Sequence, residues 1–475
     1  MSQTRQPRAP LPAHIKPVIA ALWTGNLFAP FLVSGVAAML PAIGADFAAS
    51  AVALSLVMVC YNLGQGISHM LSGRICSLLG VKRVLLAGMA AFCGFSVCMA
   101  LAQNMPMVIG LRFAQGLAAA AISCCVTVLS VSLAPPQQKG LVISAVMSAV
   151  YLGLAMGPLT CGGLTELAGW RTVFFLVAAV GAAELWLLKR IIPSDVKGVR
   201  EQGGRQGFNF ASAALAVLSL SAITFGATCG FLHPAVKFLL PAGFALLALF
   251  VRQELRSDHP ILDLRVLAKV RGLPGGMAAT FINYGSIMGL SVFFSLYLQQ
   301  VLGLNAFEAG MVMMTQSITQ ALLSPVAGRL ADRFDPVRVS TLGMAGCGLS
   351  ILMLTTLDAQ SEVWNVVLLQ ASLGTGIAFF VAPNVSATLG DVPQEHMPVA
   401  SGLLGCLRTL GGLMSHILMA GMLSLFLKDS SIGPENVGSF LEAMRYTLIL
   451  FGSLNLLSLV FGVRRSLRRA RETRN

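Results

Sequence analysis

Polar side chains that could bind a solute or a proton recur at helical spacing inside otherwise apolar stretches of this chain. Asn62, Gln65 and His69 lie three or four residues apart, and so do Gln316 and Gln320. Residues at this spacing share one face of a helix. Amides donate and accept hydrogen bonds, and an imidazole can exchange a proton near neutral pH. The pattern predicts polar faces that could line a common cavity, with interhelical hydrogen bonding as the alternative for any single Asn or Gln.

Two arginines, Arg112 and Arg408, also fall within apolar stretches, and Gln115 follows the first of them by three residues. A charge near the middle of a bilayer costs about 2.5 to 3.5 kcal/mol on insertion scales, so it usually faces a wet or paired interior. We expect a functional role for Arg112, against the alternative that it braces neighbouring helices. Both roles stay open for Arg408, and Asn283 adds a further polar group.

Carboxylates are nearly absent from these stretches. Glu184 is the only one well inside, and it lies within two turns of Lys189 and Arg190, which favours an ion pair near the edge of the stretch. His69 and His416 could carry a proton instead, although a lone histidine on a polar face is more often a hydrogen-bonded structural residue.

These residues belong to fourteen apolar stretches, each of about 20 residues and so long enough to cross a bilayer core of roughly 30 Å as a helix. Hydrophobic residues make up 56% of the chain and charged residues 11%, which leaves too little polar surface for a water-soluble globule. Backbone groups within lipid must be paired inside each segment, so such spans are helices and not barrel strands. The sequence predicts an all-α polytopic membrane protein.

The stretches fall into a group of six, a central pair and a second group of six. They lie at 17–43, 51–71, 83–103, 105–133, 139–163 and 171–192, then at 209–230 and 234–252, and then at 272–300, 308–329, 337–357, 362–389, 397–427 and 438–463. We therefore expect six-helix bundles at 17–192 and 272–463, the central pair within 209–252, loops at 193–208 and 253–271, and tails at 1–16 and 464–475. An even number of spans places both tails on one side.

Basic residues predict the orientation, because short cytoplasmic loops collect Lys and Arg. With both termini inside, most of the 32 Lys and Arg residues fall on the inner side. This bias explains most of the net charge of +13. A basic edge beside anionic lipid accounts for the basic tail without nucleic acid. We expect both termini in the cytoplasm.

Signatures of catalysis and of cofactor binding are absent from the sequence. The ten cysteines lie in or beside apolar stretches without C-x-x-C spacing, which favours a packing role over disulfides or a metal site. No Gly-rich phosphate loop, G-x-S-x-G elbow or H-E-x-x-H pair is present. We expect no enzymatic activity, no metal and no cofactor.

Two similar segments occur at equivalent places in the two groups of six. The first contains Gly73, Arg74, Lys82 and Arg83, and the second contains Gly328, Asp332 and Arg333. Matched glycines and basic residues in two inner loops indicate a parallel internal repeat. A basic turn that tethers two helices is the alternative, and it explains the charges but not the matched positions.

These loops resemble the inner loop between the second and third spans of the major facilitator superfamily. Ser77 stands where that loop usually has an Asp, and Asp335 stands where the second copy usually has a Gly. In the family this Asp helps to lock the inner gate, so the resemblance implies a gate that is altered in the first half. Arg112, Gln115 and Gly116 are similar to the R-x-x-Q-G element of the same family.

A further match lies in the fifth span. Gly153, Gly157 and Pro158 resemble the antiporter signature of exporters, with Cys161 in place of a paired glycine. Glycines let helices approach closely and proline bends a span, so the segment is either a hinge or a packing seam. The central pair and residues 252–332 resemble the fourteen-span drug:proton antiporter branch, and the resemblance covers nearly the whole chain.

One departure from that branch bears on mechanism. Its members typically carry an Asp in the first span, and this chain has Leu32 there, with no ionisable residue from Trp23 to Leu40. A proton-coupled exporter of cations needs a carboxylate that takes either a proton or the positive substrate. The departure favours neutral, zwitterionic or anionic substrates.

The resemblance implies a secondary active transporter of the inner membrane, an exporter coupled to protons in which two bundles rock around a midplane site. Its expected partners are membrane lipids, a small organic substrate and protons, with no nucleic acid. The chain is expected to act as a monomer, and a periplasmic adaptor stays open as a further partner. An uncoupled or uptake carrier for an organic anion or metabolite is one alternative, and a membrane sensor that does not transport is another.

Overall fold

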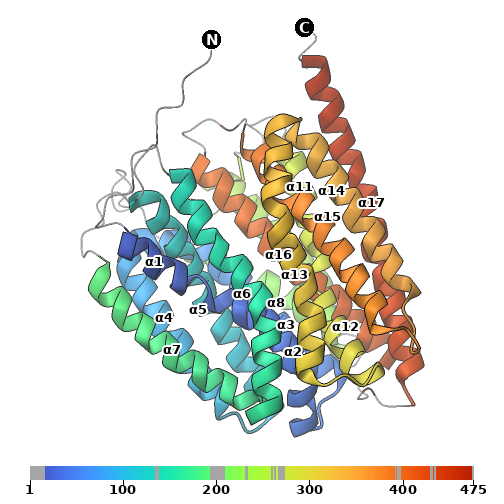
Figure 1. The fold of residues 1–475 in the computed structure, drawn as a ribbon. Coiled ribbons are helices and arrows are strands. Elements are labelled where there is room, and N and C mark those ends of the chain that lie inside the picture. The colour runs from blue at the N-terminus through green and yellow to red at the C-terminus, as the bar shows by residue number, and fades with distance from the viewer. Residues whose placement is uncertain are drawn as a thin grey trace.

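A computed structural model of the protein describes residues 16–133, 139–192, 209–229, 234–257, 260–261, 264–265, 273–390, 392, 397–427, 432 and 435–472. These residues form helices joined by short turns, with no β-strand among them (Figure 1). The predicted all-α fold is confirmed. The predicted loop 193–208, most of the loop 253–271 and nearly all of the tail 1–16 lie outside the described residues.

The first group of helices packs around the core of the amino-terminal half. It comprises α1 (Lys16–Gly25), α2 (Phe28–Phe47), α3 (Ala51–Leu79), α4 (Val81–Ala100), α5 (Met105–Leu133), α6 (Lys139–Ala168) and α7 (Trp170–Ile191). α2 packs against α6, α3 against α5, and α4 against both α5 and α7. The predicted first span is broken between α1 and α2, where the buried Asn26 donates its Nδ2 to the carbonyl of Val146 at 3.2 Å.

The central pair consists of α8 (Phe210–Cys229) and α9 (Leu239–Arg256), with the short 3-10 helix η2 (Pro234–Phe238) before α9. The two helices pack against each other, and α8 also contacts α3 and α16. α8 therefore touches both groups of six, whereas most of α9 is exposed.

The second group of helices forms the carboxy-terminal half. It comprises α11 (Leu273–Ile287), α12 (Leu290–Leu296), the π-helical turn η3 (Tyr297–Val301), α13 (Ala306–Arg333), α14 (Pro336–Met353), the 3-10 turn η4 (Leu354–Thr356), α15 (Val363–Leu389), α16 (Met397–Leu427) and α17 (Val437–Glu472). Its packing pairs are α13 with α15, α14 with α15 and α17, and α11 with α16 and α17. α17 continues as a helix to Glu472, so most of the predicted tail 464–475 is helical. In Figure 1, α4 and α7 lie on the left and α14 and α17 on the right, so the two groups stand side by side.

Twelve helices of the described chain are long and apolar enough to cross a membrane. Each predicted span coincides with a helix or a broken helix, but the predicted spans 139–163 and 308–329 match α6 and α13, which are not among the twelve. α13 carries Gln316, Gln320 and several Ser and Thr residues in its middle, which lower its mean hydropathy. The membrane-spanning class is confirmed, and the count of fourteen crossings is not.

Candidate functional site

The two groups of helices meet along three seams. α6 packs against α13, α3 against α16, and α2 against α12. We define the outer end of the molecule as the end that carries the α2–α3, α4–α5, α6–α7 and η3–α13 connections. Gln299 donates its Nε2 to the carbonyl of Ala38 at 2.9 Å in the outer half of α2. α16 meets α3 near mid-helix, where Gly66 lies beside Thr409 and Leu410.

The seam between α6 and α13 is built on glycines near the outer end. A Cβ on Gly162 would lie 2.2 Å from the carbonyl oxygen of Ala306, and a Cβ on Gly310 would lie 2.4 Å from that of Pro158. No side chain fits at these distances, so the two backbones touch. Of the predicted hinge residues, Gly153 and Gly157 instead face α2 of the same group. The segment thus joins α6 to α2 on one side and to α13 on the other.

Arg112 lies in a buried polar cluster within the first group. Its guanidinium Nη1 donates to Gln115 Oε1 at 3.0 Å, and Gln115 Nε2 donates to Ser96 Oγ on α4 at 3.0 Å. The guanidinium carbon stands 4.1 Å from the centre of the Tyr61 ring on α3. These side-chain contacts tie α3, α4 and α5 together.

The same cluster contains polar atoms without partners. Nε and Nη2 of Arg112, the hydroxyl of Tyr61 and Nε2 of His416 are buried and make no hydrogen bond within the described chain. No carboxylate of the described chain pairs with Arg112, and the buried Leu32 stands where an acid was expected. A guanidinium that is 0% exposed and lacks a counter-ion is costly, so Arg112 remains a candidate for a functional role.

His416 reaches this cluster from the second group. Its Nδ1 donates to the carbonyl of Gly412 one turn earlier on α16 at 2.8 Å. Its imidazole is close enough to Arg112 to interact electrostatically. The structure therefore brings together two residues, Arg112 and His416, that the sequence could only name separately.

A second cluster joins the two groups around Arg408. This side chain is exposed, and its guanidinium carbon lies 5.9 Å from the centre of the Tyr284 ring on α11. His69 on α3 and Tyr151 on α6 are close enough to Arg408 to interact electrostatically. The exposed cation thus stands among partly buried aromatic and imidazole groups from both halves.

The sequence reasoning missed Tyr151 in this cluster. Its signal was present, because a tyrosine in the middle of an apolar span, two residues before Gly153, is a polar group in lipid. Only the packing of α6 beside the second group shows that its ring belongs with Arg408 and Tyr284.

Of the other predicted polar residues, two form hydrogen bonds with other residues of the protein, and Gln65 is partly buried. Asn62 donates to the carbonyl of Met58 at 2.9 Å in its own helix, and Asn283 donates to Asn455 Oδ1 on α17 at 3.1 Å. Asn283 thus makes the interhelical hydrogen bond that was the alternative for a single amide, whereas the bond of Asn62 stays within α3. Gln65 is partly buried on the face of α3 that carries His69.

Gln316 and Gln320 lie on α13, one turn apart. Gln316 is partly buried and Gln320 is buried. The backbone of Gln316 packs against α15, since a Cβ on Gly374 would lie 2.4 Å from its carbonyl oxygen. The structure does not bring this pair into contact with the Arg408 cluster.

The predicted inner loops are mostly helical. Gly73 and Arg74 lie in α3, which ends at Leu79, and Gly80 alone makes the turn, with φ +86°. Gly328, Asp332 and Arg333 lie in α13. A left-handed glycine reverses the chain in one residue, so the helices extend farther than the loop reading allowed.

Side chains at these inner turns stabilise the helix ends. Lys82 Nζ donates to the carbonyl of Ile192 at the end of α7, while Arg83 is exposed. Asp335 Oδ1 accepts a hydrogen bond from Val337 N at 3.1 Å and caps α14, which accounts for an Asp where the family usually has a Gly. The side chains of Arg74, Ser77 and Asp332 lie outside the described residues.

Glu184 corrects another expectation. It is buried beside Thr24 and Gly25 of α1 and forms no salt bridge within the described chain. Arg190 stacks on Trp186 instead, 4.1 Å from the ring centre. The predicted ion pair is wrong because Glu184 and the basic residues point to different faces of α7.

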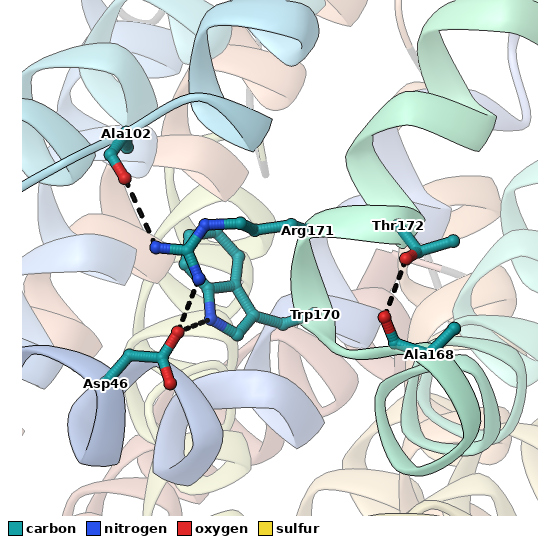
Figure 2. A network of polar contacts seen from close by, with 6 residues as sticks. All are labelled: Asp46, Ala102, Ala168, Trp170, Arg171 and Thr172. Carbon is teal, nitrogen blue, oxygen red and sulfur yellow. Dashed lines mark hydrogen bonds and ion pairs between the residues drawn. The ribbon is translucent and has the colours of Figure 1, made fainter.

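An ionic network braces the outer end of the first group (Figure 2). Asp46 Oδ2 accepts hydrogen bonds from Trp170 Nε1, at 2.9 Å, and from Arg171. Arg171 also donates to the carbonyl of Ala102 at 3.3 Å and stacks on the Trp170 ring at 4.3 Å. These contacts hold the ends of α2, α4 and α7 in one unit, and sequence reasoning did not assign a role to Asp46.

The described residues contain no group of three His, Cys, Asp or Glu side chains that could hold a metal ion. Seven of the nine cysteines whose side chains the structure describes are buried. The candidate site therefore consists of the arginine, tyrosine and histidine side chains of the two clusters described above.

Known proteins resemble this chain over most of its length. It is 26% identical over 395 residues to the multidrug resistance protein Stp of Mycobacterium tuberculosis, covering 82% of this chain and 72% of that protein. It is 26% identical over 422 residues to the tetracenomycin C resistance and export protein of Streptomyces glaucescens, covering 87% and 77%. The crystal structure of a peptide transporter, with 14% sequence identity, superposes with a TM-score of 0.70 over 96% of this chain and 94% of its own.

The family assignment follows from the sequence profile. The profile of the Major Facilitator Superfamily matches residues 22–251 and 276–475. The matched segments contain both arginine clusters and all three seams. Together with the helical fold, this match shows that the chain belongs to the major facilitator superfamily of membrane transporters.

Proposed function

We propose that this protein is a secondary active transporter that exports small organic molecules in exchange for protons. The relatives support the direction, since their names describe multidrug resistance and the export of tetracenomycin C. A third relative, from Streptomyces coelicolor and 27% identical, is named a probable actinorhodin transporter. These compounds are organic molecules, and the sequence resemblance to exporters points the same way.

The observation that carries the proposal is the cluster around Arg408. It draws side chains from α3 and α6 on one side and from α11 and α16 on the other. A solute held there would contact both halves, so a rocking motion of the halves would change its access. This is the arrangement that alternating access requires.

The chemistry of the cluster favours a substrate that is not a simple cation. Arg408 offers a planar set of donors suited to carboxylate or phenolate oxygens, and Tyr284 and Tyr151 offer ring faces. No carboxylate of the described chain joins this cluster. We therefore propose neutral, zwitterionic or anionic substrates with an apolar or aromatic body.

The close contacts between the halves support a state that is closed on the outer side. Gly162 with Ala306, Gly310 with Pro158, and Gln299 with Ala38 all lie in the outer half of their helices or just beyond it. In the orientation that the basic residues favour, this state faces the cytoplasm. We propose an inner-membrane location with both termini in the cytoplasm and a monomer of two pseudo-symmetric bundles.

Everted membrane vesicles from cells that overproduce the protein test this function. The probes are tetracenomycin C, the anionic dye fluorescein and the cationic dye ethidium. Energised vesicles should accumulate tetracenomycin C or fluorescein above vesicles without the protein, and a protonophore should abolish the difference. Absence of accumulation for all three probes, or accumulation of ethidium alone, would contradict the proposal.

An uncoupled carrier is the second candidate, and Leu32 favours it because the expected coupling acid is absent. The same vesicles separate the two candidates. An exchanger alkalinises the lumen as the probe enters, whereas an uncoupled carrier moves the probe without a change in internal pH.

A further inference from the structure

His416 has the properties of a proton acceptor that is shut off from water. A carbonyl oxygen can only accept a hydrogen bond, so the bond to Gly412 places the ring hydrogen on Nδ1. The lone pair of the neutral ring is then on Nε2, which is buried and has no partner in the described chain. The imidazole is 1% exposed.

The charged group that acts electrostatically on His416 is Arg112, which belongs to the other half. Gly412, one turn before His416 on α16, lies beside Asn62 of α3. Tyr61, which precedes Asn62 in the sequence, has its ring against the guanidinium of Arg112. Two guanidinium nitrogens and the Tyr61 hydroxyl are also without partners. The seam thus encloses the fixed positive charge of Arg112 and the imidazole of His416, which becomes a second positive charge when it binds a proton.

The helices around α16 supply nothing to offset a second charge. The titratable groups of α3 near this seam are Tyr61 and, two turns towards the inner end, His69, and that of α11 is Tyr284. α8 and α15 contain no charged residue, and α17 carries Glu442 and Arg445 near its outer end. Within the described chain, the charged residue that acts electrostatically on His416 is therefore Arg112 on α5.

We propose that His416 is the proton-binding residue of this transporter and that the charge of Arg112 expels this proton as the outer end closes. This inference rests on the proposed function. An imidazolium beside an unpaired buried guanidinium places two like charges out of water. Separation of α16 from α3 and α5 admits water and relieves the repulsion. Proton binding therefore shifts the population towards the state that is open outside.

The proton itself is conserved in this step. Nε2 takes a proton from the outer water when the seam is open, and as the seam closes beside Arg112 it gives up the same proton to water on the inner side. The residue would thereby replace the carboxylate that is missing at Leu32. No other group needs to change its charge.

Distances between spin labels on the outer end of the two halves test this coupling without a substrate. Gln103 precedes α5 and Gln360 precedes α15, and both side chains are exposed. Cysteines at these positions, with Cys98 and Cys124 changed to serine, carry the labels in nanodiscs. On lowering the pH from about 8 to about 5, across the titration range of a histidine, the wild-type distance distribution should shift to longer values.

Four variants test whether His416 and Arg112 cause the pH-dependent shift in distance. His416→Gln should keep the short distance at every pH, and Arg112→Gln should lose the shift because the repelling charge is gone. Arg112→Lys should retain it, since the charge remains, and this variant controls for loss of folding. Glu184→Gln is the matched control, because it removes a buried titratable group that touches only the first half, and it should retain the shift.

The inference is overturned if the wild type shows no shift, or if His416→Gln shifts as the wild type does. It is also overturned if His69→Gln abolishes the shift while His416→Gln preserves it. These outcomes are independent of the vesicle experiment, which asks only whether the unmodified protein moves a probe. A protein that accumulates fluorescein but shows no pH-dependent shift retains its function and loses this mechanism.

Discussion

At the scale of single residues, the two arginines differ in their surroundings and hence in their roles. Arg112 is fully buried and bonded to Gln115, whereas Arg408 is exposed beside Tyr284. A buried cation acts on neighbouring charges through a low dielectric. An exposed cation between two halves is available to a ligand. We therefore propose that Arg112 serves coupling and that Arg408 serves binding.

Substitution of Arg408 separates its charge from its shape. Arg408→Lys keeps the charge but loses the planar set of donors that suits carboxylate or phenolate oxygens. We expect the KM for fluorescein in everted vesicles to rise about 2- to 5-fold, with little change in the maximal rate. Arg408→Gln should raise KM further. Equal KM values for the wild type and Arg408→Gln would remove Arg408 from the binding site.

What the sequence could predict at this scale was the type of residue and not its neighbours. Arg112 and Arg408 stood out because charges in apolar stretches are costly. Asn283 stood out for the same reason but bonds Asn455, more than 170 positions away. Tyr151 and Asp46 were missed because their partners come from other helices, and spacing along one helix carries no information about them.

At the scale of elements, the seam between α6 and α13 depends on backbone contact. Each of Gly162 and Gly310 lies where an added Cβ would overlap a carbonyl group of the opposite helix. The antiporter-like pattern around Gly157 and Pro158 predicted a hinge or a packing seam. The structure shows packing against both α2 and α13, because small residues on two faces of α6 let it touch two neighbours.

A large side chain in this seam should hold the outer end apart. Gly162→Leu cannot close against Ala306, so the outer end should stay open. Dye accumulation should be lost, and the spin-label distance should be long at every pH. The matched control is Gly94→Ala on the exposed face of α4, where no atom lies within 4 Å of the new Cβ.

The control variant should transport normally and gain about 0.5 to 1 kcal/mol of helix stability. A Gly162→Leu protein that folds, closes and transports as the wild type does would show that the seam is not a gate. Thermal unfolding in detergent reports whether each variant is folded.

For the molecule as a whole, the predicted all-helical membrane fold is confirmed, whereas the number of crossings and the bounds of several helices differ from the prediction. Apolar length and composition sufficed for helices and a membrane class, because lipid leaves few alternatives for the backbone. The inner turns were placed too broadly, since a single residue such as Gly80 reverses the chain. The breaks within the first and ninth spans were not foreseen, because buried contacts such as that of Asn26 with Val146 decide them.

The central claim is that the two halves must part and rejoin at their outer ends during each transport cycle. Gly163 and Phe307 face each other across the α6–α13 seam, where a Cβ on Gly163 would lie 3.1 Å from the Phe307 ring. Gly163→Cys combined with Phe307→Cys, joined by a short bis-methanethiosulfonate, links the halves there. Each single variant, treated in the same way, serves as the control.

Fluorescein accumulation in everted vesicles is the measurement, taken before linking, after linking and after reduction. The account predicts that linking abolishes accumulation in the double variant alone and that reduction restores it. Undiminished accumulation in a fully linked protein would contradict the account, because the solute would then cross without any separation of the outer ends.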